Sequence, residues 1–255
     1  FRQGVLVDCT PSNLMSGEPG FSLARLALDK GWHLVTASKG ALVLRPDELK
    51  ALAKEKGLAI KASAAAAAAL PTIDVGRRSL AGAEILAIEG ILNGTSNYIL
   101  TRMAEGLDFE AALKEAQEKG IAEPDPSLDI DGWDTGAKMV IIANEVLNTE
   151  IKLSEAQVRG IRGLKKEILE KASSLNKILK LFGKCYREKA GEPWKIEVGL
   201  ALLDPVHPLA MTSGTNKGII FYTDTMGWVA VSGGQSSPTG AAAALLKDII
   251  SIYRP

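Results

Sequence analysis

Cysteine is scarce in this sequence, and neither sign of charge is in excess. The 255 residues include two cysteines, Cys9 and Cys185, which lie far apart and in no spacing typical of a metal site. Two such cysteines argue against a disulfide scaffold, so we expect a reducing compartment, the cytoplasm. The 30 basic and 30 acidic residues cancel. A general binding surface for nucleic acids is therefore not indicated.

Long hydrophobic runs and a signal peptide are also missing. No apolar run approaches the roughly 20 residues of a membrane-spanning helix, and the chain begins in a strand-like segment. Apolar residues make up 46% of the chain and charged residues 24%, as in ordinary globular proteins. We expect no membrane partner, and the length allows one large domain or two moderate ones.

Predicted strands and helices alternate in the N-terminal part of the chain. Short apolar runs are followed by amphipathic segments that end in lysine and glycine. The strands are predicted over 4–10, 33–38 and 58–63, and the helices over 22–31 and 46–57. This order implies parallel strands joined by right-handed crossovers. The fold class is therefore α/β, with part of a Rossmann-type doubly wound parallel sheet.

The alternation loosens after residue 82, where a mixed α+β region is predicted. Strands are expected over 83–92, 177–186, 194–203, 218–223 and 228–233, forming an antiparallel or mixed sheet. Helices are expected over 97–105, 109–119, 131–146 and 154–162, with a charged connector over 165–171. A last helix over 239–253 is expected to return to the first layer.

Residues 63–70, SAAAAAAL, form the one low-complexity segment of the chain. Loops that follow strands usually contain glycine, serine or asparagine, because they need unusual backbone angles. Two interpretations stay open. The tract is a plain helix start, since alanine is the best helix former, or its original side chains have been replaced.

A cluster of charges lies in IAEPDPSLDIDGWDTGAKM, residues 121–139. Ser127 and Asp129 are predicted to cap a helix that starts near residues 129–131. Asp134 and Lys138 are four residues apart and therefore lie on one face of this helix. An exposed ion pair is the simplest interpretation. The flanking residues Trp133, Ala137 and 139–142 are apolar, however, and indicate a buried helix.

A buried lysine beside an acid is a candidate general acid. Glu123 and Asp125 each precede a proline in the loop Glu-Pro-Asp-Pro, and the fixed φ angles of the two prolines hold the backbone in one conformation. Asp125 and Asp131 need no role beyond loop formation and capping. Rigid carboxylates near a cationic lysine suit an amino acid substrate, whose ammonium group needs an acidic partner.

Three segments make the chain resemble homoserine dehydrogenase. They are ILNGTSNYIL at 91–100, the run FEAALKEAQEKGIAEPDPSLDIDGWDTGAKMVIIAN at 109–144, and VTASKG at 35–40. The resemblance extends from VLVDCTPSNL to the last helix. It implies reduction of aspartate 4-semialdehyde to homoserine with NADP or NAD as cofactor, on the route to threonine, isoleucine and methionine.

The resemblance also implies roles for individual residues. Lys138 falls on the catalytic lysine, with Lys39 as the second candidate. Glu123, Asp129 and Asp134 fall on acids that bind the substrate. The implied cofactor contacts are Thr10, Pro11, Ser38, Lys39, Gly233 and Gly234; a serine stands at position 38 where the family usually has asparagine. The NGT turn at 93–95 is expected to shape the site.

A structural monovalent cation, Na⁺ or K⁺, is a further implication of the resemblance. Its ligands would be the backbone carbonyls of Ala66, Ala68 and Leu70, and the family's glutamate falls on Ser63. The implied domains are the C-terminal half of a dinucleotide-binding domain (1–82), a substrate-binding and dimerisation domain (83–230) and a returning helix (231–255). The implied assembly is a homodimer.

The dinucleotide fingerprint G-x-G-x-x-G does not follow an opening strand anywhere in this chain. We therefore expect the N-terminal half of the dinucleotide-binding domain to be missing. One alternative is a non-catalytic fragment for substrate binding and dimerisation. A weaker alternative is another semialdehyde dehydrogenase with a thiol nucleophile, but Cys9 lies at a strand end and not in a suitable loop.

Overall fold

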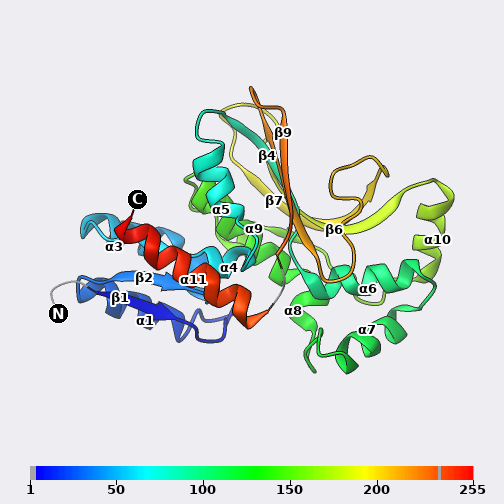
Figure 1. Ribbon diagram of the computed structural model, residues 1–255, viewed down its shortest axis with the longest axis horizontal. Helices are drawn as coiled ribbons and strands as arrows, with labels where there is room; N and C mark the ends of the chain where they lie inside the picture. Colours follow the sequence, from blue (N-terminus) through cyan, green and yellow to red (C-terminus); the bar gives the residue numbers. More distant parts are fainter. Residues whose placement is uncertain (1–3, 235–236, 255) are drawn as a thin grey trace.

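Two β-sheets of different size organise the molecule (Figure 1). The computed structural model describes residues 4–234 and 237–254. Within these residues, the small sheet has three parallel strands in the order β1-β2-β3. The large sheet has the order β5-β7-β6-β4-β8-β9 and is antiparallel except for the β5–β7 pair. A parallel sheet joined to a mixed sheet confirms the predicted fold class.

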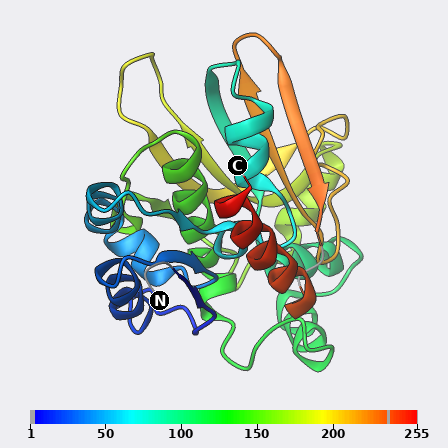
Figure 2. The same ribbon diagram turned by 60° about the vertical axis from the view of Figure 1, so that its left-hand side comes forward.

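The small sheet and its helices occupy one end of the molecule. The elements are β1 (Val5–Asp8), α1 (Gly20–Asp29), β2 (His33–Thr36), α2 (Gly40–Leu44), α3 (Pro46–Glu55), β3 (Ile60–Lys61) and α4 (Ser63–Ala67). The last helix, α11 (Pro238–Tyr253), runs back across the chain and packs against α4 and β2 (Figures 1 and 2). The alanine tract therefore begins as a helix, as one of its two interpretations has it.

The large sheet carries its helices mainly on one face and at one end. Its strands are β4 (Ile85–Ile91), β5 (Gln157–Val158), β6 (Ile178–Tyr186), β7 (Lys195–Leu203), β8 (Lys217–Thr223) and β9 (Trp228–Gly233). The helices are α5 (Thr72–Asp74), α6 (Gly94–Ala104), α7 (Phe109–Glu118), α8 (Ser127–Ile130), α9 (Trp133–Val146) and α10 (Lys166–Ser174), with a π-helical turn over Val75–Ser79.

The start of the central helix differs from its prediction. The sequence predicts one helix that starts at residues 129–131. The structure has two helices there: the short helix α8, which ends at Ile130, and α9, which begins at Trp133. The two are separated by Gly132, whose φ of 87° lies in the left-handed region that interrupts a helix. Neither Ser127 nor Asp129 caps a helix with its side chain. The predicted caps are therefore wrong, and Asp129 has other partners.

The segment between the central helix and β6 was assigned wrongly in two places. The helix predicted over 154–162 is a single 3₁₀ turn (Leu153–Glu155) followed by the edge strand β5. The backbone of this segment binds distant elements instead: the N–H of Arg159 donates to the carbonyl of Val198 and that of Ile161 to the carbonyl of Ile130. Gly160 presses against α8, since a Cβ atom on Gly160 would lie 2.0 Å from the carbonyl oxygen of Ile130. The predicted connector over 165–171 is helix α10, because Leu169 and Ala172 form a buried face.

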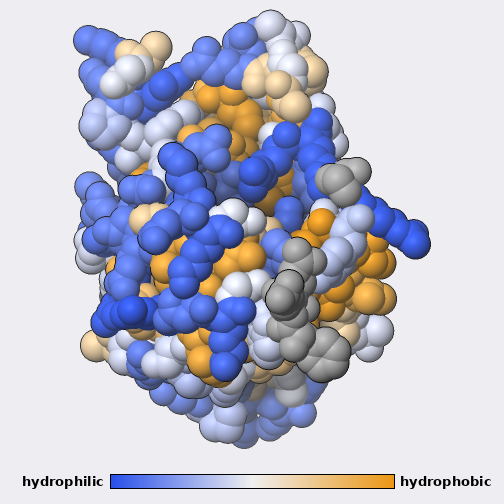
Figure 3. Space-filling view, turned by 90° about the vertical axis from the view of Figure 1, so that its left-hand side faces the viewer, coloured by the Kyte–Doolittle hydropathy of each residue, from blue (hydrophilic) through white to orange (hydrophobic). Residues whose placement is uncertain are grey.

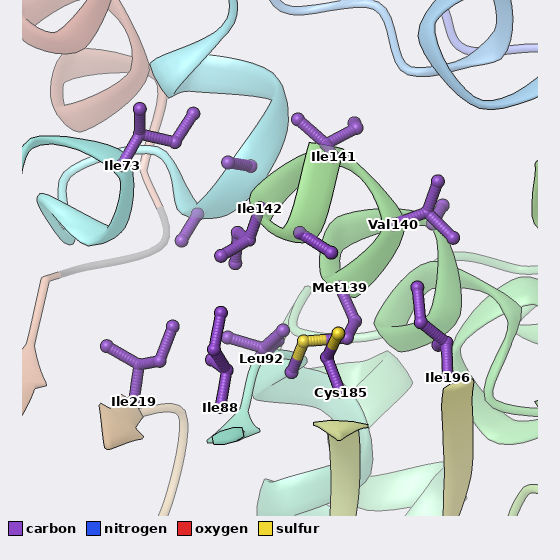
Figure 4. Close-up of a cluster of buried hydrophobic side chains, with 14 of the residues drawn as sticks. Ile73, Ile88, Leu92, Met139, Val140, Ile141, Ile142, Cys185, Ile196 and Ile219 are labelled. Atoms are coloured by element: carbon purple, nitrogen blue, oxygen red, sulfur yellow. The ribbon is translucent and has the colours of Figure 1, made fainter. Parts of the chain in front are cut away.

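Helix α9 lies at the centre of the largest hydrophobic core, as its apolar composition predicted (Figure 4). Met139, Val140 and Ile142 are fully buried and pack against Ile88 of β4 and its neighbours in the sheet. Trp133, at the first turn of α9, is 40% exposed. The prediction of burial therefore holds for the body of the helix and fails for the tryptophan.

The surface around the small sheet mixes charged and apolar side chains. Apolar patches lie between charged groups on the face turned to the viewer in Figure 3. Val7 of β1, Leu26 of α1 and Ile250 of α11 are among the exposed apolar side chains of this region. Across residues 4–234 and 237–254, we find no helix that combines the length and the apolar character of a membrane span.

Candidate active site

A buried ion pair on α9 forms the centre of the candidate site. Lys138 Nζ lies 2.6 Å from Asp134 Oδ2, and the two side chains are only 16% and 11% exposed. The same ammonium group donates a hydrogen bond of 3.0 Å to the carbonyl oxygen of Leu92, at the end of β4. The pair is therefore not the exposed surface pair of the simplest interpretation. It joins the central helix to the strand beneath it.

A second lysine reaches the same carboxylate from the small sheet. Lys39 follows β2 and places its Nζ 3.4 Å from Asp134 Oδ1, with 20% of its side chain exposed. Burial alone would raise the pKa of Asp134, but the ammonium groups of Lys138 and Lys39 outweigh it and hold that pKa well below its usual range. Asp134 is therefore a carboxylate bound between two cations from different parts of the chain.

Asn93 organises the acids at the start of α6. Its amide nitrogen donates to Asp129 Oδ1 at 2.6 Å and to Asp134 Oδ2 at 2.8 Å. Its amide oxygen caps α6 by accepting a hydrogen bond from the backbone N–H of Ser96 at 2.8 Å. All polar groups of the Asn93 side chain are thereby engaged. The turn expected to shape the site holds its two acids directly.

Asp129 and Glu123 have different surroundings. Burial, together with the charge of Asp134, raises the pKa of Asp129, and the hydrogen bond from Asn93 opposes this shift. Glu123 lies exposed in the loop after α7, and its backbone carbonyl accepts a hydrogen bond from Gln117 at 3.3 Å. The structure thus gathers Asp129 with Asp134 and Lys138. In the described residues it gives the Glu123 carboxylate no hydrogen bond to this group.

The carboxyl ends of β1 and β2 are joined next to the lysines. Asp8 accepts hydrogen bonds from the Thr10 hydroxyl at 2.7 Å and from the Thr36 hydroxyl at 2.9 Å. The backbone N–H of Lys39 donates to the Ser12 hydroxyl at 2.9 Å. This edge of a parallel sheet is where ligands of open α/β folds bind. Neither Asp8 nor Ser12 was predicted as a site residue. An aspartate at the end of an apolar strand is a pattern that could have indicated Asp8.

A mostly apolar cavity of about 650 Å³ opens beside this edge. It is lined by residues of the loop after β1, including Pro11 and Ser12, and by Trp133 at the start of α9. A larger cavity, about 850 Å³, lies between α6 and α10 and contains none of the predicted site residues. The smaller cavity reaches the sheet edge at Pro11 and Ser12, and its lining does not include Lys39, Asp134 or Lys138.

Comparison with known proteins assigns the family. The family model described as homoserine dehydrogenase matches residues 71–250. The chain is 41% identical over 255 residues to a homoserine dehydrogenase of Methanocaldococcus jannaschii, covering 98% of the chain and 72% of that protein. It is 39% identical over 250 residues to an NAD(+)-dependent homoserine dehydrogenase of Pseudomonas canavaninivorans, covering 98% of the chain and 71% of that protein. The chain belongs to the homoserine dehydrogenase family.

Solved structures agree with this assignment. The crystal structure of a putative homoserine dehydrogenase from Archaeoglobus fulgidus superposes with a TM-score of 0.87 at 37% identity, covering 98% of this chain and 74% of that one. A homoserine dehydrogenase from Thiobacillus denitrificans gives a TM-score of 0.92 at 30% identity, covering 98% of this chain and 57% of that one. The resemblance stated from the sequence is therefore confirmed, and so is the enzyme class.

The remaining residues predicted to bind the cofactor of a homoserine dehydrogenase have mixed positions. Thr10 and Pro11 lie at the sheet edge, and Pro11 lines the 650 Å³ cavity. Ser38 is 2% exposed, and its hydroxyl has no hydrogen-bond partner among the described residues. Gly233 ends β9 and Gly234 follows it; a Cβ atom on Gly234 would lie 2.8 Å from the backbone nitrogen of Leu70. Gly234 is thus needed for packing against the alanine tract.

The loop implied to hold a cation has its own hydrogen bonds. The carbonyl of Leu70 accepts from the backbone N–H of Thr72 at 2.8 Å. The carbonyl of Ala67 accepts from Lys217 Nζ at 3.0 Å, and the hydroxyl of Ser63 accepts from Lys247 Nζ at 2.7 Å. Among residues 4–234 and 237–254, no group of three or more histidine, cysteine or acidic side chains could hold a metal. Lys217 was not singled out from the sequence.

Proposed function

We propose that this site interconverts L-homoserine and L-aspartate 4-semialdehyde with NAD or NADP, in the biosynthesis of threonine, isoleucine and methionine. The observation that carries the proposal is the position of Asp134 between Lys138 and Lys39. One lysine comes from the helix of the substrate region and the other from the edge of the small parallel sheet. A substrate bound at this junction would meet both a proton donor and the cofactor edge.

The cofactor edge suits the nicotinamide end of NAD or NADP. The cavity beside it is mostly apolar and is lined by Pro11, Ser12 and Trp133, which fits a flat ring with a polar amide. Thr10, Pro11 and Lys39 would hold this end, with Ser38, Gly233 and Gly234 as weaker candidates. When bound, the cofactor accepts hydride from homoserine and donates hydride in the reverse direction.

Lys138 is the residue that we assign to proton transfer. A lysine ammonium has three N–H donors, and in Lys138 two of them point to Asp134 and to the carbonyl of Leu92. The third has no acceptor among residues 4–234 and 237–254 and can meet the substrate oxygen. In aldehyde reduction it stabilises the charge that develops on this oxygen and then donates the proton. In homoserine oxidation the same nitrogen takes the proton from the hydroxyl.

The acids position the lysines and bind the amino group of the substrate. Asp134 fixes the orientation of Lys138 and brings Lys39 to the same place. Asp129, adjacent through Asn93, can neutralise a substrate ammonium, which would also satisfy a carboxylate that burial destabilises. Glu123 lies on the exposed loop and is assigned to the same ammonium group as a further acid.

Replacement of Lys138 by methionine tests the proposal. The rate of homoserine-dependent NADH or NADPH formation should fall by about 10²-fold or more, because general acid–base groups contribute ~10²–10⁴-fold. The matched control is Lys114→Met, which removes the lysine of an exposed i,i+4 pair with Glu118 on α7. Near-normal turnover of Lys138→Met would exclude this lysine from catalysis.

The alternative of a non-catalytic binding fragment rests on the missing G-x-G-x-x-G fingerprint. It predicts no turnover with any nicotinamide cofactor and no measurable cofactor binding by these 255 residues, because they contain no such fingerprint to bind the pyrophosphate. Calorimetry with NADP separates the two functions. Binding in the micromolar range contradicts the fragment hypothesis.

We also propose that the protein is a cytoplasmic homodimer with the three domains expected from the sequence. The balanced charge and the two unpaired cysteines, one exposed and one buried, support a reducing environment. Sedimentation equilibrium tests the assembly. A mass equal to one chain at all concentrations would contradict the dimer.

A further inference from the structure

Two lysines from distant elements reach the alanine tract, which comprises residues 63–70. Lys217, at the start of β8, donates a hydrogen bond of 3.0 Å to the carbonyl of Ala67. Lys247, on α11, donates one of 2.7 Å to the hydroxyl of Ser63. The tract therefore has an ammonium group near each end. This is the loop on which homoserine dehydrogenases were expected to hold Na⁺ or K⁺.

Lys217 is an unusual core residue. Only 2% of it is exposed, and a charged side chain is rarely buried without compensation. Burial, with a smaller effect from the Lys138 ammonium, lowers the pKa of Lys217 to about 8, while Asp134 opposes this shift. A buried lysine is thus kept at a cost, in contact with a backbone carbonyl. We expect a buried ammonium group where its positive charge stabilises the fold.

The other end of the tract has its charges already matched. Asp248 of α11 is 1% exposed and accepts hydrogen bonds from the Ser63 backbone N–H at 2.9 Å and from the Ser63 hydroxyl at 2.8 Å. Lys247 Nζ lies 2.7 Å from Asp248 Oδ1 and also pairs with Asp74. The carboxylate near the loop therefore comes from α11, and a lysine of the same helix neutralises it.

Three oxygen atoms of the tract already accept hydrogen bonds, and that of Leu70 is one of the implied carbonyl ligands. The hydroxyl at position 63, where the resemblance places a carboxylate, accepts a hydrogen bond from Lys247. The carbonyl of Ala67 is taken by Lys217, and that of Leu70 by Thr72. A metal ion at the Ala67 carbonyl would meet the Lys217 ammonium, and one at the Ser63 hydroxyl would meet the Lys247 ammonium, so repulsion between like charges opposes a cation at either oxygen.

We propose that Lys217 and Lys247 replace the monovalent cation on this loop, so that the protein needs neither Na⁺ nor K⁺ to hold it in place. Lys217 also joins β8 of the large sheet to the tract at the end of the small sheet. The positive charge that links the large sheet to the tract therefore belongs to a lysine side chain and not to a bound ion. The proposal concerns stability and goes beyond the proposed reaction, so its readout does not depend on turnover.

Thermal unfolding in three chloride salts tests the proposal. The protein is melted in NaCl, KCl and N-methyl-D-glucamine chloride at one ionic strength, since the last cation is too large to enter the loop. The wild type should have the same Tm in all three. Lys217→Ala should lose several degrees in N-methyl-D-glucamine chloride and regain at least half of that loss in NaCl or KCl, because a small cation can take the vacated place.

The matched control is Lys180→Ala. Lys180 is 4% exposed, lies on β6 of the same sheet and donates to the carbonyl of Thr212 at 2.6 Å, yet it does not contact the tract. Its loss should lower Tm equally in every salt. If Lys217→Ala does not fold in any salt, the comparison is made with Lys247→Met, since Lys247 is 40% exposed.

Two outcomes would overturn the proposal. A saturable increase in the wild-type Tm with Na⁺ or K⁺, compared with N-methyl-D-glucamine, would mean that the loop binds a metal despite its lysines. An identical response of the lysine variants to all cations would mean that the loop does not require a positive charge.

Discussion

Asp134→Asn isolates the charge at the centre of the site while keeping its shape. Asp134 is 8% exposed and is bound by Lys138 at 2.6 Å, Lys39 at 3.4 Å and the Asn93 amide at 2.8 Å. Asparagine has one oxygen in place of two, and its NH₂ group must face an ammonium or another NH₂ group. The variant therefore leaves two buried cations without their shared anion.

The size of the effect follows from these distances. Two unit charges about 4 Å apart attract by roughly 4 kcal/mol at an effective dielectric constant of ~20, and the desolvation of the ions offsets part of this gain. Removing one partner of a buried pair costs about 3–5 kcal/mol. For a chain of this length, 1 kcal/mol lowers Tm by ~2–4 °C. We expect Asp134→Asn to lower Tm by roughly 6–20 °C.

The pH dependence provides an independent check. The ammonium groups of Lys138 and Lys39 hold the pKa of Asp134 in the folded protein well below its ordinary value of 3.8. A carboxylate whose pKa is lowered by folding stabilises the fold fully at pH values above its pKa in the unfolded chain. This stabilisation is lost as the pH falls from that value through the pKa in the folded protein. The difference in Tm between wild type and Asp134→Asn should therefore be constant from about pH 5 to 8 and shrink below about pH 4.

The control is Asp131→Asn, three residues earlier in the chain. Asp131 pairs with Arg162 at 2.6 Å, but these side chains are 32% and 53% exposed, and exposed pairs contribute about 0–1 kcal/mol. Both variants are melted by circular dichroism across the pH range. If Asp134→Asn lowers Tm no more than Asp131→Asn does, the ion cluster is not the structural centre of the site.

Two further predictions concern the turn at Asn93 and the alanine tract. Asn93→Ala should lower the free energy of unfolding in urea by about 3 kcal/mol, from lost hydrogen bonds to two carboxylates and a lost helix cap. Asn93→Ser should lose about 1 kcal/mol less, because serine caps α6; equal losses would contradict the capping role. Ala68→Gly should raise the free energy of unfolding by about 1 kcal/mol, since φ is 52° at Ala68. Ala69→Gly is its control and should bring no gain.

The sequence predicts a helix or strand correctly where the residues of that element alone determine its structure. The strands β1, β2, β4 and β6 to β9 follow from apolar runs between turn residues, and α3 follows from acids at its start and lysines at its end. The predictions fail where a contact with a distant segment determines the local structure. Nothing near Gly160 in the sequence indicates that α8 will press against it, and the two buried residues of α10, Leu169 and Ala172, are too few to distinguish a helix from a connector.

The contacts of the candidate site fall into the same two groups, those that follow from local sequence and those that depend on distant segments. The contact between Asp134 and Lys138 follows from helical spacing, because residues four apart share a face. The approach of Lys39 to Asp134 depends on how the small sheet packs on α9, which local pattern does not encode. The same holds for Lys217, whose burial becomes visible only when β8 and the alanine tract are placed together.

Asn93 explains why the two parts of the site stay in register. Its side chain caps α6 and binds Asp129 and Asp134, while the carbonyl of Leu92, the residue before it, binds Lys138. One turn thus fixes a helix start, two carboxylates and a lysine. Because Asp134 in turn binds Lys39, a small movement of this turn would reach the edge of the parallel sheet. We therefore expect substitutions at Asn93 to impair substrate binding and proton transfer together.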